Sequence, residues 1–155
     1  MQANPADEIL PGLWLGNIVA SQSAEFLVGK KIKAVFNCTK NIPFHEAVRI
    51  RYRVPVDDNL EEDEIRNMSL WSFEAVYKLR LEHLKGPVLV HCHAGMQRSA
   101  CVVAMYLIAV KGFKVEEAID YIRERRPIAF RPSANFLKSI YDFERNFDKQ
   151  IRPNI

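Results

Sequence analysis

One short segment combines a nucleophile with an anion-binding side chain: residues 91–99 read His-Cys-His-Ala-Gly-Met-Gln-Arg-Ser. An apolar run precedes the segment at residues 87–90, and a longer one follows at residues 100–110. This order predicts a strand, a tight loop and a helix, which together point several backbone N–H groups at one position and favour an anion there. The helix start and the Arg98 guanidinium both favour the thiolate of Cys92, and the guanidinium can bind two oxygens of a phosphate or carboxylate. We therefore expect a strong nucleophile and a tetrahedral-anion site in one loop.

Other interpretations of this loop explain less of it. A zinc site would need His91, Cys92 and His93 together, but neighbouring residues in a strand point to opposite faces, and no Cys-x-x-Cys pair completes the ligand set. The nucleotide-binding pattern G-x-x-x-x-G-K-[ST] does not occur in the chain. We expect no metal and no cofactor. The alternative without a catalytic role is a buried structural cysteine beside a surface arginine.

A loop of this kind would act on a phosphate monoester in two displacements, with a phosphocysteine between them. The backbone N–H groups of residues 93–98 and the Arg98 side chain would stabilise the transferred group. A carboxylic acid opposite Cys92 would protonate the leaving group and later deprotonate water. Asp57 and Asp58 follow an expected strand and are the candidates, and strand alternation does not choose between them.

The periodicity of apolar residues predicts strands that alternate with helices. The expected strands are a short one within residues 9–16, then residues 33–38, 49–56 and 88–90. The expected helices are residues 21–28 with Ser21 as N-cap, 61–84 with a solvated acidic first turn, 97–110, 115–125, and a last one from residues 132–133. The alternation predicts an α/β fold with a central, mostly parallel sheet of about five strands and helices on both faces. The active crevice should lie beyond the carboxyl ends of the strands, where Cys92 is expected.

The composition fits one globular domain: 155 residues, 48% of them hydrophobic, with a net charge of +3. The longest apolar run, at residues 100–110, is too short to span a bilayer, and no dense block of Lys and Arg argues for nucleic acid. The N-terminus lacks the features of a secretory signal, and three cysteines do not make a disulfide framework. We expect a cytoplasmic or nuclear protein without membrane or nucleic-acid partners, and its oligomeric state is not indicated.

The loop pattern His-Cys-x-x-Gly-x-x-Arg-Ser resembles the signature of cysteine-dependent protein phosphatases. The chain as a whole resembles the dual-specificity protein phosphatases, a subgroup of the protein tyrosine phosphatase superfamily, and the similarity includes residues 8–16, 36–39, 126–128 and 135–137. The resemblance implies a protein tyrosine phosphatase-like fold, with a catalytic domain over residues 8–147, an N-terminal tail over 1–7 and a C-terminal tail over 148–155. It also implies that Asp58 is the acid, because the segment Val54-Pro55-Val56-Asp57-Asp58 fits the family motif. Asp57 remains the alternative candidate.

The resemblance implies roles for further residues. The phosphate-binding positions are His93, Ala94, Gly95, Met96, Gln97 and Arg98, and the side chains of residues 93, 96 and 97 are expected to rim the pocket. Ser99 would bond the Cys92 sulfur and help it leave phosphorus, although it could also cap the helix. His91 would brace the loop and tune the Cys92 thiol, or would simply be a packed residue without such a role. Arg131 lies in a segment that resembles a family loop in which a basic residue can contact substrate. The chain departs from the family there: the loop between Pro127 and Pro132 is one residue longer, and Ser133 stands where the family often has Asn. We therefore expect Arg131 to be a solvated charge rather than a substrate contact.

The implied activity is hydrolysis of phosphotyrosine, phosphoserine and phosphothreonine in phosphorylated proteins, through a phosphocysteine on Cys92. Phosphoinositide phosphatases of the superfamily tend to carry lysines in this loop, and RNA 5′-triphosphatase relatives often show Asn before the Arg and Thr-Gly after it, so both alternatives fit less well. A phospho-binding module without catalysis is the alternative from another class, and the presence of Cys92, Arg98 and Asp58 counts against it. Cys38 and Cys101 are expected in the core; capture of an oxidised Cys92 by a neighbouring thiol would need proximity.

Overall fold

A computed structural model describes residues 3–151 of the chain and contains one five-stranded sheet. The strands are β1 (Ala6–Leu10), β2 (Leu13–Gly16), β3 (Ala34–Asn37), β4 (Ile50–Arg53) and β5 (Val88–His91). Their order across the sheet is β1-β2-β5-β3-β4, and only the β1–β2 pair is antiparallel. The expectation of a mostly parallel sheet of about five strands is therefore confirmed.

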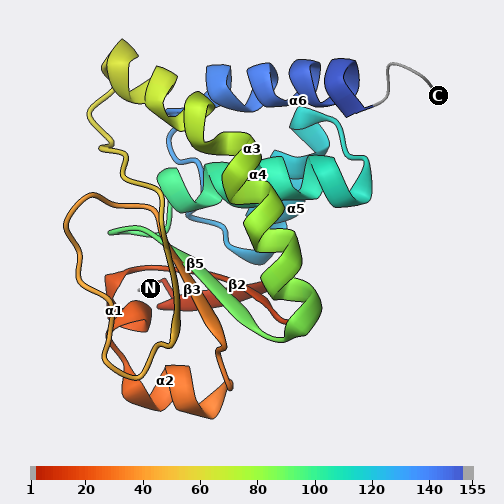
Figure 1. Cartoon of the computed structure of the whole chain (residues 1–155). Helices are drawn as coiled ribbons and strands as arrows, with labels where there is room; N and C mark the ends of the chain where they lie inside the picture. Colours follow the sequence, from red (N-terminus) through yellow and green to blue (C-terminus); the bar gives the residue numbers. More distant parts are fainter. Residues whose placement is uncertain (1–2, 152–155) are drawn as a thin grey trace.

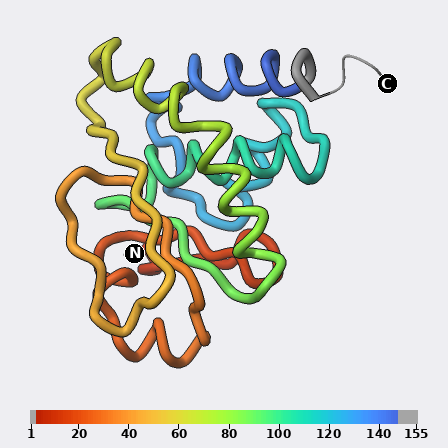
Figure 2. The backbone as a smooth tube through the Cα atoms, in the orientation of Figure 1, coloured from red at the N-terminus to blue at the C-terminus, as the bar shows by residue number. Residues whose placement is uncertain are grey.

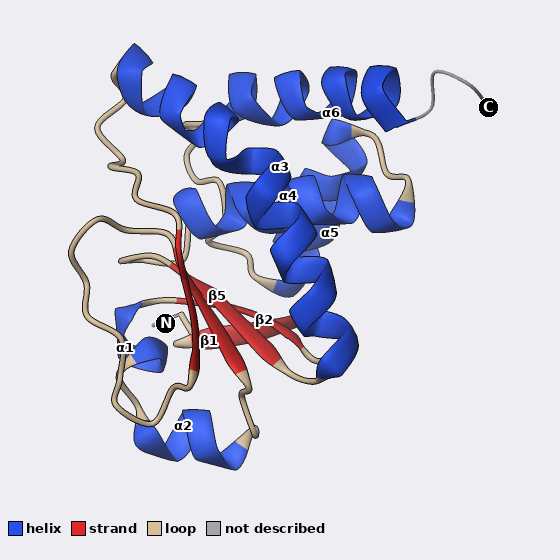
Figure 3. Ribbon diagram, viewed as in Figure 1, coloured by secondary structure: helices blue, strands red, loops and turns tan. Residues whose placement is uncertain are grey.

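Helices cover both faces of this sheet (Figure 1). One face carries α3 (Glu62–Lys85), α4 (Arg98–Lys111), α5 (Val115–Arg125) and α6 (Leu137–Ile151), and the other carries α1 (Ile18–Ser21) and α2 (Ala24–Gly29), as Figure 3 shows. Ten of the fourteen residues of α4 are buried, so this helix forms the centre of the larger core. Because β5 runs into α4 through a short loop, the packed core fixes both ends of that loop.

Regular structure extends beyond both residues that the resemblance gives as domain bounds. β1 begins at Ala6, inside the segment expected to be an N-terminal tail, and Asp7 makes a buried ion pair described below. α6 continues to Ile151, past the expected domain end at residue 147, and residues 152–155 lie outside the described residues.

Two helix starts also differ from the prediction. Ser23, not Ser21, is the N-cap of α2, and its hydroxyl accepts a hydrogen bond from the N–H of Phe26 at 3.1 Å. Ser21 ends the separate short helix α1. The last helix begins at Leu137 rather than at residues 132–133, because the preceding segment is hydrogen bonded to another loop.

β4 is an edge strand and is shorter than predicted. Val54 still donates to the Asn37 carbonyl at 2.9 Å, but Pro55 has no N–H for the ladder and the chain leaves the sheet. Residues 54–61 then run from the carboxyl end of β4 to the start of α3, as the tube in Figure 2 shows. Within residues 3–151, no helix has both the length and the apolar character needed to cross a membrane.

Candidate active site

The loop between β5 and α4 is held by its carbonyl oxygens. All five carbonyls of residues 92–96 accept hydrogen bonds from groups outside the turn itself. The N–H groups of Ile18 and Phe130 bind two of them, at 2.9 and 2.8 Å. The guanidinium of Arg126 binds those of residues 94 and 95, at 3.3 and 2.8 Å. Because C=O and N–H point in opposite directions across a trans peptide, outward carbonyls leave the amide N–H groups facing inward, as an anion site requires.

Gly95 makes this tight loop sterically feasible. Its φ is +67°, a conformation that side chains rarely adopt, and a Cβ would lie 2.6 Å from the Gly16 carbonyl oxygen and 2.8 Å from Nη2 of Arg126. Only glycine fits both conditions. The loop is therefore packed directly against the end of β2.

Arg126 is a supporting residue whose role the sequence did not reveal. Its side chain is fully buried, and besides the loop carbonyls it binds the Asp7 carboxylate and the Asn4 carbonyl, both at 2.8 Å. Every loop contact of this guanidinium is thus charge-assisted, and the charge is paired. A signal did exist, because Arg126 comes directly after the predicted helix and four residues after Ile122, in line with the apolar face of that helix.

Cys92 lines a cavity at the carboxyl end of the sheet. The cavity has a volume of about 390 Å³, and its lining residues are Asp58, Cys92, His93, Ala94, Met96, Gln97, Arg98, Arg131 and Asn135. The Sγ of Cys92 is 3.0 Å from the Oγ of Ser99, which fits the predicted contact. Ser99 does not cap α4, because the N-cap position belongs to Gln97.

Arg98 reaches the same cavity from the first residue of α4. One of its terminal nitrogens, Nη1, donates to the Val56 carbonyl at 3.0 Å, and its buried Nε has no hydrogen-bond partner among residues 3–151. A buried guanidinium N–H normally has a partner, so this group can pair with an oxyanion bound next to the Cys92 sulfur.

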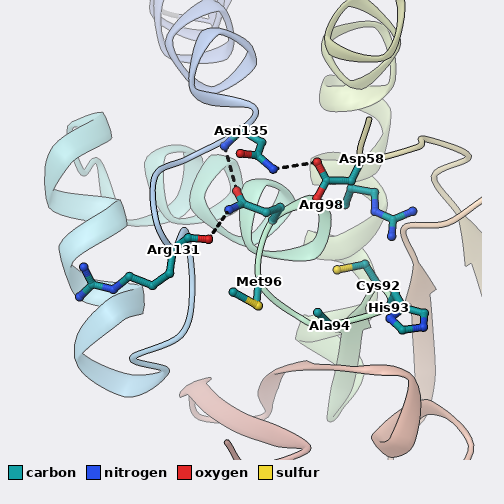
Figure 4. Close-up of a pocket in the computed structure, with 9 residues that line it drawn as sticks. Asp58, Cys92, His93, Ala94, Met96, Arg98, Arg131 and Asn135 are labelled. Carbon is teal, nitrogen blue, oxygen red and sulfur yellow. Dashed lines mark hydrogen bonds between the residues drawn. The ribbon is translucent and has the colours of Figure 1, made fainter. Parts of the chain in front are cut away.

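The two candidate acids point in different directions. Asp58 lines the cavity, and its Oδ1 accepts a hydrogen bond from the Asn135 side chain at 2.9 Å (Figure 4). Asp57 instead pairs with Lys40, with 3.2 Å between Oδ2 and Nζ, and is not among the lining residues. The structure therefore brings Asp58, not Asp57, to the cavity that contains Cys92.

The acidic start of α3 also holds the loop that carries Asp58. Glu64 is only 7% exposed, so this residue does not belong to a solvated first turn as expected. It binds Lys40 at 2.7 Å and the Asn67 side chain at 3.3 Å. Burial acts to raise the pKa of Glu64, but the hydrogen bonds from Lys40 and Asn67 outweigh it, and the pKa is lowered. Asn67 also donates to the Pro55 carbonyl at 2.9 Å, so the loop is tied to α3 just before Asp57.

Gln97 is largely buried, and its side chain binds a second loop instead of only rimming the pocket. Its Nε2 donates to the carbonyls of Ser133 at 2.8 Å and Arg131 at 3.2 Å, and its Oε1 accepts from the backbone N–H of Asn135 at 2.9 Å. These bonds hold residues 131–135 out of a helix and explain why α6 begins later than predicted. Asn135 is a site residue that was not predicted from the sequence.

His91 is buried below the loop. Its Nδ1 is 3.1 Å from the Cys92 carbonyl oxygen, and its buried Nε2 has no partner among the described residues. Burial lowers the pKa of His91 to about 4, and the nearby charges of Arg53 and Arg98 act in the same direction. The neutral ring therefore carries its proton on Nδ1 and donates it to the loop, which fits a bracing role.

The remaining predicted residues lie at the rim or in the core. His93 and Ala94 are exposed and Met96 is partly exposed, all three along the cavity. Arg131 is exposed, donates to the Pro127 carbonyl, and extends away from Cys92 in Figure 4. Within the described residues, no three or more His, Cys, Asp and Glu side chains are grouped to hold a metal ion.

Cys38 and Cys101 are buried, free thiols, as expected for core residues. Cys38 follows β3 and donates its N–H to the His91 carbonyl, which makes it the neighbour of Cys92 across the two parallel strands. Burial raises the pKa of both thiols, and for Cys38 the charges of Cys92 and Cys101 add to this effect. Neither thiol is a ready nucleophile at neutral pH.

The sequence model of the dual-specificity phosphatase catalytic domain matches residues 13–146. The chain belongs to this family. It is 34% identical over 139 residues to human dual specificity protein phosphatase 4 and, over the same length, 34% identical to human dual specificity protein phosphatase 2. These matches cover 88% of the chain but 34% and 43% of the relatives, so the chain spans well under half of their length.

Solved structures of the family have the same fold. Human DUSP28 is 25% identical with a TM-score of 0.77, over 95% of this chain and 97% of that protein. A mouse putative dual specificity phosphatase, crystallised with zinc tungstate, is 27% identical with a TM-score of 0.77, over 97% and 94% of the two chains. The predicted fold class and family resemblance are thereby confirmed.

Proposed function

We propose that this chain hydrolyses phosphotyrosine, phosphoserine and phosphothreonine in proteins through a phosphocysteine on Cys92. The observation that carries the proposal is the shared cavity: the thiol, the Arg98 guanidinium and the Asp58 carboxyl all line it, and Ser99 lies 3.0 Å from the sulfur. A nucleophile, an anion-binding group and an acid in one cavity are the set that this reaction needs.

In the first step, the Cys92 thiolate attacks phosphorus while the inward-facing loop amides and Arg98 bind the three non-bridging oxygens. The leaving oxygen is then on the side opposite the sulfur, where Asp58 lines the cavity. Asp58 donates its proton to that oxygen, and the S–P bond forms as the P–O bond breaks.

In the second step, the ionised Asp58 accepts a proton from a water molecule that attacks the phosphocysteine. The S–P bond breaks, and the sulfur leaves as a thiolate. The Ser99 hydroxyl, placed within hydrogen-bond distance of Sγ, stabilises the developing negative charge there. Inorganic phosphate is the product, and the enzyme returns to its starting state.

The cavity supports broad specificity for the phosphorylated residue. None of its nine lining residues is Phe, Tyr or Trp, and the one ring among them, the His93 imidazole, is exposed at the rim, so no large aromatic side chain selects a phenyl ring. Recognition then depends mainly on the phosphate, which is common to all three phosphoresidues. The loop itself has no lysine to favour a multiply phosphorylated headgroup. The mouse relative crystallised with zinc tungstate supports a site for tetrahedral anions in this fold.

The deciding experiment compares the wild type with Cys92→Ser on a small aryl phosphate and on phosphotyrosine, phosphoserine and phosphothreonine peptides. We expect turnover only with the wild type, inhibition by vanadate, and a mass increase of one phosphoryl group on residue 92 after rapid quenching. Equal rates for the two proteins would overturn the proposal. Phosphoinositide and RNA 5′-triphosphate substrates in the same assay test the alternatives of a phosphoinositide phosphatase and an RNA 5′-triphosphatase.

A cytoplasmic or nuclear location is proposed on sequence grounds alone.

A further inference from the structure

We propose that Asn135 is the positioning residue of the acid: it orients Asp58 toward the cavity, and Gln97 of the phosphate loop holds Asn135 in place. The inference rests on the function proposed above and adds the group that aligns its proton donor.

Asp58 has little else to fix its side chain. It lies in an exposed stretch, residues 58–61, with no strand or helix around it. Within residues 3–151, the hydrogen bond from Nδ2 of Asn135 to Oδ1, at 2.9 Å, is the one side-chain bond that the carboxyl makes. The exposed carboxyl would otherwise sample several rotamers. This bond selects one of them.

The same bond determines where the acid carries its proton. An amide N–H can donate only to an oxygen that does not itself carry a hydrogen on that side. With Oδ1 occupied by Asn135, a protonated Asp58 carries its proton on Oδ2, the oxygen that stays free. Asn135 thus determines which oxygen of the acid delivers the proton to the leaving group. After the transfer, the same N–H stabilises the carboxylate that must bind water in the second step.

Asn135 is itself held by the phosphate loop. Its backbone N–H donates to Oε1 of Gln97 at 2.9 Å, and Nε2 of Gln97 binds the Ser133 and Arg131 carbonyls on the same loop. Gln97 is only 6% exposed and directly precedes Arg98. The position of the acid is therefore set relative to the phosphate loop through consecutive hydrogen bonds, which Figure 4 shows as dashed lines.

Ser133 lies in the same loop but does not take part in holding the acid. This serine stands where the resemblance places the family's frequent Asn, in a loop that is one residue longer. In the structure its carbonyl binds Gln97, and its exposed side chain makes no contact with Asp58. The side-chain amide that binds Asp58 comes from Asn135, two residues later.

The test uses the dependence of rate on the leaving group, because loss of an aligned acid slows poor leaving groups more than good ones. For Asn135→Ala we expect kcat/KM, which reports the first step, to fall by about 30-fold on phenyl phosphate and by less than about threefold on p-nitrophenyl phosphate. The vanadate inhibition constant should stay within about twofold, because the phosphate loop is intact. Ser133→Ala, a change in the same loop without a bond to Asp58, is the matched control and should behave as wild type on both substrates.

A structural role alone would give a different result. If Asn135→Ala merely loosened the fold, kcat/KM would fall equally on both substrates and vanadate would bind more weakly. That outcome overturns the proposal. Gln97→Met, which removes the bonds to the loop while keeping a buried side chain of similar size, should show the same preference for good leaving groups. Equal losses on both substrates in this variant would also count against the proposed link.

A second measurement does not require turnover. In the wild type, the side-chain NH₂ resonances of Asn135 should shift with pH as Asp58 titrates. This pH dependence should vanish in Asp58→Asn and persist in Asp57→Asn. If the Asn135 resonances do not change when Asp58 is replaced, the inference is overturned even if the protein is an active phosphatase. If the pH response is present but the protein has no activity, only the proposed function is wrong.

Discussion

The phosphate loop, residues 92–98, and the acid loop, residues 54–61, face the same cavity but are fixed in different ways. The phosphate loop joins a buried strand to a buried helix, and its carbonyls are held by backbone groups and by the fully buried Arg126. The acid loop is mostly exposed from residue 58 onward, and side chains from three distant segments hold it: Lys40, Asn67 and Asn135.

This difference separates binding from proton transfer. Binding an anion with backbone N–H groups needs a rigid geometry, and a loop anchored at every carbonyl provides it. An acid and base must instead approach different leaving groups and then a water molecule, and individual side-chain bonds permit small adjustments. Substitutions in the phosphate loop should therefore lower both stability and activity, whereas substitutions in the acid loop should lower mainly activity.

The largest combined effect is expected for Gly95→Ala. The new Cβ would meet the Gly16 carbonyl at 2.6 Å in a backbone with φ of +67°, so the loop must move. We expect a loss of at least about 2 kcal/mol in the free energy of unfolding and a fall in kcat/KM of more than about 100-fold. Urea unfolding and aryl phosphate kinetics measure the two quantities.

Gly112→Ala is the matched control for that variant. Gly112 has a similar φ of +70° as the C-cap of α4, but apart from its neighbours in the chain no atom lies within 4 Å of the position that a Cβ would take there. It should lose about 1 kcal/mol from the left-handed backbone alone and keep full activity. If Gly95→Ala and Gly112→Ala lose activity to a similar extent, the loss comes from backbone strain and not from the packing of the phosphate loop against β2.

The next largest effect separates the two neighbouring aspartates. Asp58→Asn removes the acid and base, so kcat should fall by about 100-fold or more with phenyl phosphate, while vanadate still binds. Asp57→Asn removes an exposed partner of Lys40, and kcat should fall by no more than about threefold. A reversed order of the two variants would assign the acid role to Asp57.

The contrast between the loops also explains what could be predicted from the sequence. The phosphate loop is continuous in sequence, and its apolar flanks define the strand and helix that fix it, so the positions of Cys92 and Arg98 followed from residues 87–110. The contact of Ser99 with the sulfur followed from the family resemblance. The fold followed from the same alternation of strands and helices.

The acid loop and its supports could not be derived in the same way. Asp57 and Asp58 are adjacent, and what distinguishes them is Lys40 on one side and Asn135 on the other, residues that are distant in sequence. Family resemblance selected Asp58, but periodicity could not, because no repeating pattern connects residues 40, 58 and 135. For the same reason, Gln97 was expected at the rim and Glu64 in solvent, although both side chains are buried with long-range partners.

A smaller effect should appear in the pH dependence of stability through His91. Burial lowers its pKa from 6.5 to about 4 in the folded protein. Below pH 6.5 the unfolded chain binds a proton at this residue and the folded protein does not, so stability is lost as the pH falls from about 6.5 to about 4. The loss should reach about 3 kcal/mol.

His91→Asn keeps a donor near the Cys92 carbonyl and removes the titration. Its free energy of unfolding, measured by urea titration across this pH range, should fall less steeply than that of the wild type. His93→Asn, at an exposed position, should follow the wild-type curve. Parallel curves for wild type and His91→Asn would mean that the imidazole is not held neutral by burial.

The smallest effect is expected for Lys40→Met, which removes one anchor of the acid loop. Lys40 binds both Asp57 and Glu64, but its side chain is 44% exposed and solvent weakens such pairs. We expect kcat on phenyl phosphate to fall by about threefold, because Asn135 and Asn67 still hold the loop. Lys138→Met, which breaks the exposed pair with Asp142 away from the site, should leave kcat unchanged. If Lys40→Met instead lowers kcat as much as Asp58→Asn, the acid loop depends on a single anchor, and the proposed sharing of its position among several side chains is wrong.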